Sequence, residues 1–131
     1  MTAKGRKILV VDDEQHSVQR IRTGLERAGY EVITALGGQE ALARTALERP
    51  DLLVLDAMMP YMDGLEVLDH LRKDPQTRRL PVIMLTLGEQ DAATFRGWQA
   101  SCNAYLVKPV PAAELISCIQ RLFAENEGLG A

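Results

Sequence analysis

Short apolar runs alternate with helical patterns along the whole chain. Five of these runs predict strands, and four are almost wholly apolar, which is typical of strands buried on both faces of a parallel sheet. The exception, residues 30–35, mixes polar with apolar side chains and predicts an edge strand. The five predicted strands cover residues 8–11, 30–35, 52–55, 82–85 and 104–107.

Five helices are predicted between and after these strands. Four have clear apolar positions at helical spacing. The fourth in chain order, about residues 90–99, has a thin apolar stripe and Gly97 in its interior, which costs about 1 kcal/mol relative to Ala. We therefore expect that segment to be the most mobile. The other helices are marked by Val18, Ile21 and Leu25, by Ala41, Leu42 and Ala46, by Leu65, Leu68 and Leu71, and by Leu115, Ile119 and Leu122.

Five strands alternating with five helices predict an α/β fold, a doubly wound five-stranded parallel sheet with helices on both faces. A length of 131 residues is near the commonest size for one domain. We expect a single domain over residues 1–131, with a core at 7–123 and a frayed tail at 124–131.

Composition excludes several classes of function. The chain is 47% hydrophobic and 25% charged, which is an ordinary balance for a globular domain. The net charge of −3 without a basic cluster disfavours nucleic acid or a membrane surface as a direct partner. No apolar run is long enough to span a bilayer, so we expect a cytoplasmic protein. Cys102 and Cys118 lack a metal-ligand spacing and are expected to be reduced thiols.

Side chains that can carry chemistry follow four of the predicted strands. Asp12 and Asp13 follow the first, Asp56 the third, Thr86 the fourth and Lys108 the fifth. Ligands of an open α/β sheet bind beyond these carboxyl ends. If the first and third strands are neighbours, the three carboxylates crowd together and need a compensating cation. Oxygen ligands favour Mg²⁺ or Mn²⁺, and zinc is disfavoured because no His or Cys joins the cluster.

Each of these residues also has an ordinary structural explanation. An aspartate after a buried strand commonly caps the next helix, and Asp13 could do so for a helix that begins near Gln15. The coincidence of three acids, a hydroxyl and an amine at four strand ends nevertheless favours a site.

Four short motifs occur in order along residues 7–123. Together they resemble the receiver domain of two-component response regulators, a family with the flavodoxin-like strand order 2-1-3-4-5. The motifs are Ile8-Leu9-Val10-Val11-Asp12-Asp13-Glu14, Leu55-Asp56-Ala57-Met58-Met59-Pro60 with Asp63-Gly64, Pro81-Val82-Ile83-Met84-Leu85-Thr86, and Tyr105-Leu106-Val107-Lys108-Pro109.

The resemblance implies that Asp56 is a nucleophile that accepts a phosphoryl group from a histidine kinase or a histidine phosphotransfer protein. It implies that Asp13, Asp56 and the backbone carbonyl of Met58 bind Mg²⁺ directly, and that Asp12 binds it through water. Lys108 would neutralise the phosphoryl oxygens, and a cis Lys108–Pro109 bond would aim its side chain.

The implied output is a phosphorylation-activated switch and not a turnover enzyme. Thr86 would turn its hydroxyl toward the phosphoryl group, and Tyr105 would follow by turning inward. A downstream protein would then bind the face formed by the fourth helix, the fifth strand and the fifth helix.

Four positions are notable against the family pattern. Leu87 replaces a small residue, and it either narrows the entrance to Asp56 or points at the fourth helix. Cys102 stands where the family commonly has an alanine. It is either a packed, alanine-like residue or a redox sensor. Met58 and Gly88 offer no polar side chain to position water, which predicts slow loss of the phosphoryl group.

Other functions fit the residues less well. Aspartyl-phosphate hydrolases place a second acid two residues after the nucleophile, where this chain has Met58. A nucleotide or flavin binder needs a glycine-rich first loop, and this loop is Asp-Asp-Glu. A receiver belonging to a longer response regulator or hybrid kinase stays open as an alternative.

Overall fold

The computed structural model describes residues 5–87 and 102–130 of the chain. Strands and helices alternate in the order that the sequence predicts. They are β1 (Lys7–Val11), α1 (Gln15–Arg27), β2 (Glu31–Ala35), α2 (Gly38–Glu48), β3 (Leu52–Asp56), α3 (Gly64–Lys73), β4 (Val82–Thr86), β5 (Ala104–Val107) and α5 (Ala112–Gly130).

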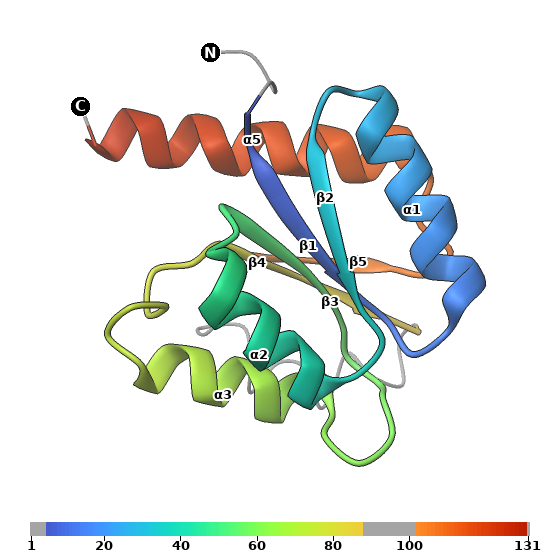
Figure 1. Cartoon of the computed structure of the whole chain (residues 1–131). Helices are drawn as coiled ribbons and strands as arrows, with labels where there is room; N and C mark the ends of the chain where they lie inside the picture. Colours follow the sequence, from blue (N-terminus) through green and yellow to red (C-terminus); the bar gives the residue numbers. More distant parts are fainter. Residues whose placement is uncertain (1–4, 88–101, 131) are drawn as a thin grey trace.

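The five strands form one parallel sheet in the order β2-β1-β3-β4-β5. This confirms the predicted fold class and the predicted edge position of β2. Figure 1 shows α2 and α3 on one face of the sheet and α1 and α5 on the other. Four helices lie within the described residues, not the five expected, because the helix predicted over residues 90–99 falls outside them.

Alternate side chains of each central strand enter two separate apolar cores. In β1, Ile8 and Val10 pack with α1 and α5, whereas Leu9 and Val11 pack with α2 and α3. All four side chains are completely buried. This two-sided burial is the physical reason why the strand sequences are continuously apolar.

The buried side of α2 differs from the prediction at one position. Ala46 is exposed, and Thr45 takes the buried position one turn after Ala41. The Thr45 hydroxyl donates a hydrogen bond of 2.7 Å to the Ala41 carbonyl oxygen. A polar side chain is tolerated there because the helix itself satisfies its hydroxyl. The apolar pattern alone pointed to the wrong residue.

Helix α5 continues through residues 124–130, where the sequence analysis expected a frayed tail. Fraying of this end in solution stays a prediction. None of the described helices has both the length and the apolar content needed to cross a membrane.

The start of α3 is held close to the end of β3. The Gly64 backbone N–H donates to the Ala57 carbonyl oxygen at 3.0 Å. A side chain cannot fit at residue 64, because a Cβ there would lie 2.6 Å from the Asp56 carbonyl oxygen and 2.8 Å from the Ala57 Cα. Both of those atoms are backbone, so they cannot move aside cheaply.

We predict that Gly64→Ala lowers the free energy of unfolding by about 2 kcal/mol, since the extra methyl group overpacks the β3–α3 junction. Urea unfolding measures this change. Gly37→Ala is the matched control, because a Cβ at residue 37 meets no atom within 4 Å. Equal stability of the two variants would contradict the assignment of a tight junction.

Candidate functional site

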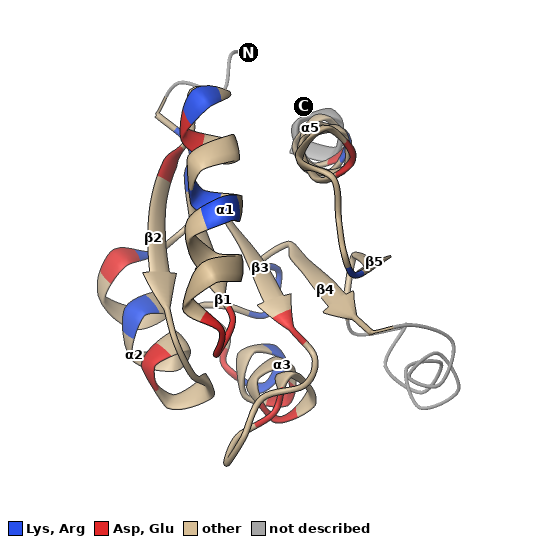
Figure 2. Cartoon of the chain, turned by 90° about the vertical axis from the view of Figure 1, so that its right-hand side faces the viewer, with Lys and Arg blue, Asp and Glu red and all other residues tan. Residues whose placement is uncertain are grey.

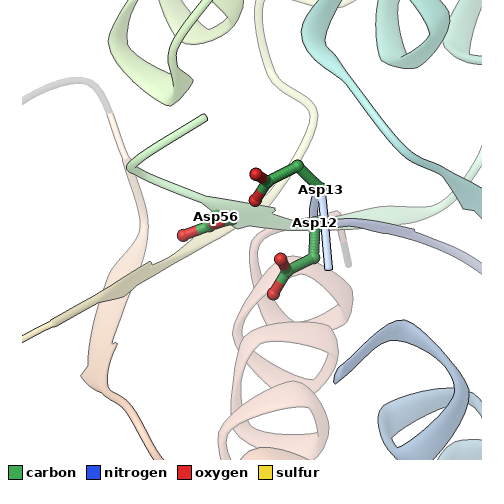
Figure 3. A group of neighbouring side chains, drawn as sticks. All are labelled: Asp12, Asp13 and Asp56. Atoms are coloured by element: carbon green, nitrogen blue, oxygen red, sulfur yellow. The ribbon is translucent and has the colours of Figure 1, made fainter. Parts of the chain in front are cut away.

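The predicted acidic cluster forms at the carboxyl edge of the sheet. Parallel pairing of Val11 with Leu55 places Asp12 beside Asp56, as expected if β1 and β3 are neighbours. One carboxylate oxygen from each of Asp12, Asp13 and Asp56 lies within 4.8 Å of the others (Figure 3). Asp12 and Asp56 are buried, whereas Asp13 is exposed to solvent. Figure 2 shows acidic segments at the ends of both strands.

Lys108 brings a positive charge into this cluster from the end of β5. Its Nζ lies 2.9 Å from Asp12 Oδ2 and 3.1 Å from Asp56 Oδ1. The Lys108–Pro109 peptide bond is cis, as the resemblance implied. Burial lowers the pKa of Lys108, but the hydrogen bond to Asp12 and the charge of Asp56 more than offset that effect, so the pKa is raised. The ammonium group therefore stays charged.

The pKa of Asp56 is raised to about 6. Burial is the largest cause, and the negative charge of Asp12 is the second. Lys108 and a 3.2 Å hydrogen bond from the Met58 backbone N–H act in the opposite direction. Asp56 is thus a carboxylate whose charge the protein alone only partly compensates.

The first loop orients Asp12 and leaves Asp13 available. Asp12 Oδ1 accepts a hydrogen bond of 2.9 Å from the Glu14 backbone N–H, the pattern of an Asx turn. The N-cap of α1 is Glu14, and no side chain caps this helix. The alternative in which Asp13 caps the helix is therefore wrong.

The remaining predicted site residues are distributed around the cluster. Thr86 is buried at the end of β4, one position beyond the residue that pairs with Asp56. Tyr105 lies on β5 with 44% of its surface exposed, and it is not part of the cluster. Met58 and Leu87 are 51% and 65% exposed in the loops that follow β3 and β4.

Both cysteines are free thiols, as predicted. Cys102 is half-buried, with its side chain packed against the core on the α3 side of the sheet. It is therefore packed less completely than the interpretation as a buried alanine-like residue assumed.

One interaction of the site does not follow from the sequence. The resemblance assigned Lys108 to the phosphoryl oxygens alone, whereas the structure pairs Lys108 with Asp12 as well as with Asp56. A partial signal is present in the sequence, because three acids and one lysine share the same edge of the sheet. Only the side-chain positions show which of the acids the lysine contacts.

The cluster fits a hard divalent cation. Three carboxylates face a single ammonium group, which leaves two negative charges uncompensated among these four side chains. Every donor is a carboxylate oxygen, and such donors suit Mg²⁺ and Mn²⁺. The exposed Asp13 keeps one side of the cluster open to solvent, which suits an ion that retains several waters.

Comparison with known proteins agrees with this fold and identifies a family. The profile of the response regulator receiver domain family matches residues 8–120. The alkaline phosphatase synthesis transcriptional regulatory protein PhoP of Bacillus subtilis is 39% identical over 93% of this chain and 50% of that protein. The probable transcriptional regulator ycf27 of Cyanophora paradoxa is 42% identical over 97% of this chain and 52% of that protein. The chain thus spans about half the length of these curated relatives.

Solved structures give the same result. A response regulator receiver domain protein from Clostridium thermocellum is 32% identical and superposes with a TM-score of 0.86, covering 95% of this chain and 98% of that one. The chemotaxis protein CheY4 of Vibrio cholerae is 35% identical with a TM-score of 0.81, covering 88% and 97%.

The fold and the acidic site define a phosphoacceptor signalling domain and not a turnover enzyme. The chain belongs to the response regulator receiver domain family of two-component systems.

We predict that Asp56→Asn raises the free energy of unfolding of the metal-free protein by about 1–2 kcal/mol at neutral pH, because it removes a buried charge repelled by Asp12. At pH values between 3.8, the ordinary pKa of an aspartate, and about 6, Asp56 binds more protons in the folded state than in the unfolded state. The free energy of unfolding of the wild type therefore falls as the pH rises through this range. That of Asp56→Asn does not, because asparagine does not titrate.

Urea unfolding in a chelating buffer at pH 4 and pH 7.5 tests this, with Asp69→Asn on the exposed side of α3 as the control. A variant that is less stable than wild type at pH 7.5 would contradict the assigned electrostatics.

Proposed function

We propose that Asp56 is the phosphoacceptor of a signalling switch. The observation that carries the proposal is the position of its carboxylate, which is buried at the end of β3 with the Lys108 ammonium group 3.1 Å away and two further carboxylates beside it. The donor would be a phosphohistidine of a histidine kinase or a histidine phosphotransfer protein, the donor class of the family.

In the proposed reaction, a carboxylate oxygen of Asp56 forms a bond to phosphorus while the bond between phosphorus and the donor's histidine nitrogen breaks. The nitrogen keeps the electron pair of that bond, and the product is an acyl phosphate on Asp56. A pKa of about 6 leaves the Asp56 carboxylate mainly ionised at neutral pH, as a nucleophile requires. Lys108 is already in place to neutralise a phosphoryl oxygen.

Asp13, Asp56 and the backbone carbonyl of Met58 would hold Mg²⁺ directly, and Asp12 would hold it through water. Mn²⁺ has the same ligand preference. When bound, the ion supplies positive charge to the oxygens of the transferred group. Asp12 accepts hydrogen bonds from the Glu14 backbone N–H and from Lys108 Nζ, and this fixed carboxylate supports the proposed role.

The output would be a change of surface on the β5 side of the sheet. Thr86 pairs with Val107 across β4 and β5. This neighbouring position supports the proposal that a turn of the Thr86 hydroxyl toward a phosphoryl group alters β5. Tyr105, two positions earlier on β5, is half-exposed, and we propose that it follows Thr86 by turning inward. The downstream partner would be a protein that binds β5, α5 and the segment between β4 and β5, in the cytoplasm, without direct contact to nucleic acid or membrane.

We predict that acetyl phosphate with Mg²⁺ adds one phosphoryl group to the protein, read by intact mass. The adduct should be absent from Asp56→Ala and from samples without a divalent ion, because the nucleophile or its charge compensation is then missing. Asp69→Ala, which removes an exposed acid of α3, should label as the wild type does. An adduct that persists in Asp56→Ala would refute the assignment.

We also predict that Leu87→Ala accelerates labelling by acetyl phosphate about threefold, because Leu87 is a large side chain just beyond β4, next to Thr86, and its truncation opens the approach to Asp56. Met58→Ala is the comparison on the β3 side of the entrance. Time courses of intact mass measure both rates, and an unchanged rate for Leu87→Ala would mean that this side chain does not restrict small donors.

A further inference from the structure

A cavity of about 690 Å³ opens between the C-terminal parts of α2 and α3. Figure 1 shows these helices side by side on one face of the sheet. The segment of residues 74–80, which leads from α3 to β4, forms the third wall. The cavity is separate from the acidic cluster, since α3 begins beside Asp56 and reaches the cavity at its opposite end. Its volume is in the range of small-molecule sites.

The lining of the cavity is mixed, and its apolar part includes three leucine side chains. Leu42 of α2, Leu71 of α3 and Leu80 before β4 line it. Leu71 is buried, and Leu42 and Leu80 are partly buried against the same core. The partly buried Leu42 and Leu80 therefore supply most of the exposed apolar surface, and Leu71 lies behind it with 2% of its surface exposed.

The third wall is fixed by hydrogen bonds. Arg72 donates through Nη1 to the carbonyl oxygens of Thr77, Arg78 and Leu80 at 3.2, 3.1 and 2.8 Å. The Thr77 hydroxyl donates to the Leu71 carbonyl oxygen at 2.6 Å. These bonds hold the segment against the end of α3, so the cavity is preformed.

The rim of the cavity carries an excess of positive charge. Among its ionised lining residues, Arg49 and Lys73 are cationic and only Asp74 is anionic. Lys73 pairs with Asp69 at 2.9 Å, and Asp74 Oδ1 accepts a hydrogen bond from the Gln76 backbone N–H. Within residues 5–87 and 102–130, no hydrogen bond or ion pair engages the Arg49 side chain. A guanidinium group thus lies at a cavity that also has leucine side chains in its lining, in a chain of net charge −3.

The backbone at Arg49 adds to this observation. Arg49 is the C-cap of α2 and has left-handed dihedral angles, φ 50° and ψ 63°. Glycine is the usual residue there because it adopts them without strain. An arginine at this position costs conformational energy and supplies five hydrogen-bond donors at the mouth of the cavity. His70, also without a partner in the described part of the chain, adds a further ring nitrogen at the rim.

We propose that this cavity binds a small amphipathic anion, with its apolar body against the three leucines and a carboxylate, sulfonate or phosphate group on Arg49. The proposal is independent of phosphorylation at Asp56.

The test uses two fluorescent probes with the same apolar body. 8-Anilinonaphthalene-1-sulfonate carries an anionic group, and N-phenyl-1-naphthylamine lacks it. Fluorescence titration of the whole chain should show one saturable site for the sulfonate probe. Arg49→Gly should weaken that probe about tenfold, the loss of one charge-assisted contact, and change binding of the neutral probe less than about twofold. Glycine suits the left-handed position, so the variant stays folded.

Arg44→Ala is the matched control, because Arg44 lies on the same helix and pairs with Glu40 and Glu48 outside the cavity. It should bind both probes as the wild type does. Ala46→Trp, at an exposed position that lines the cavity, should block both probes by filling the space.

Amide chemical shifts should change at residues 42–50 and 70–80 when the sulfonate probe is added.

Competition then identifies the class of ligand. Stronger displacement of the sulfonate probe by decanoate identifies an alkyl carboxylate, and stronger displacement by 1-naphthyl phosphate identifies an aromatic phosphate. Unchanged sulfonate affinity in both Arg49→Gly and Ala46→Trp, or shift changes confined to other surfaces, would overturn the proposal.

Discussion

The contact between Lys108 and two buried carboxylates is the interaction on which the rest of this structure depends. Parallel pairing of β1 with β3 forces Asp12 and Asp56 together at the edge of the sheet, where burial and the negative charge of Asp12 disfavour the ionised form of Asp56. One ammonium group bridges them at 2.9 and 3.1 Å. The negative charge that Lys108 leaves uncompensated favours binding of a divalent cation. Lys108 can also contact the oxygens of a group transferred to this site.

Two features of the chain make this arrangement possible. The Lys108 side chain at the end of β5 must reach past the ends of β4 and β3 to meet Asp12. The Lys108 backbone N–H is fixed by a 2.7 Å hydrogen bond to the Thr86 carbonyl oxygen. The start of α3 must approach the end of β3 closely, which only a residue without a side chain allows, and Gly64 is that residue. The strand ends that bring the Asp12 and Asp56 carboxylates together therefore also hold the Lys108 ammonium group beside them.

Much of the fold could be predicted because strands buried on both faces of the sheet are continuously apolar in the sequence. Continuous apolar strands such as β1 and β3 identify a parallel sheet, and acids directly after them identify its functional edge. Thr45 could not be predicted as a buried residue, because its hydroxyl is satisfied within α2. The pairing of Lys108 with Asp12, and the cavity beside Arg49, depend on side chains brought together from distant segments, which periodicity does not report.

The most direct test of the account is chemical identification of the phosphorylated side chain. Borohydride reduces an acyl phosphate on an aspartate to the alcohol, which converts that residue into homoserine and is read by peptide mass spectrometry. After incubation with acetyl phosphate and Mg²⁺, we predict homoserine at position 56 and unmodified Asp12 and Asp13. Homoserine at position 12 or 13, or at none of the three, would contradict the claim that Asp56 is the nucleophile of this site.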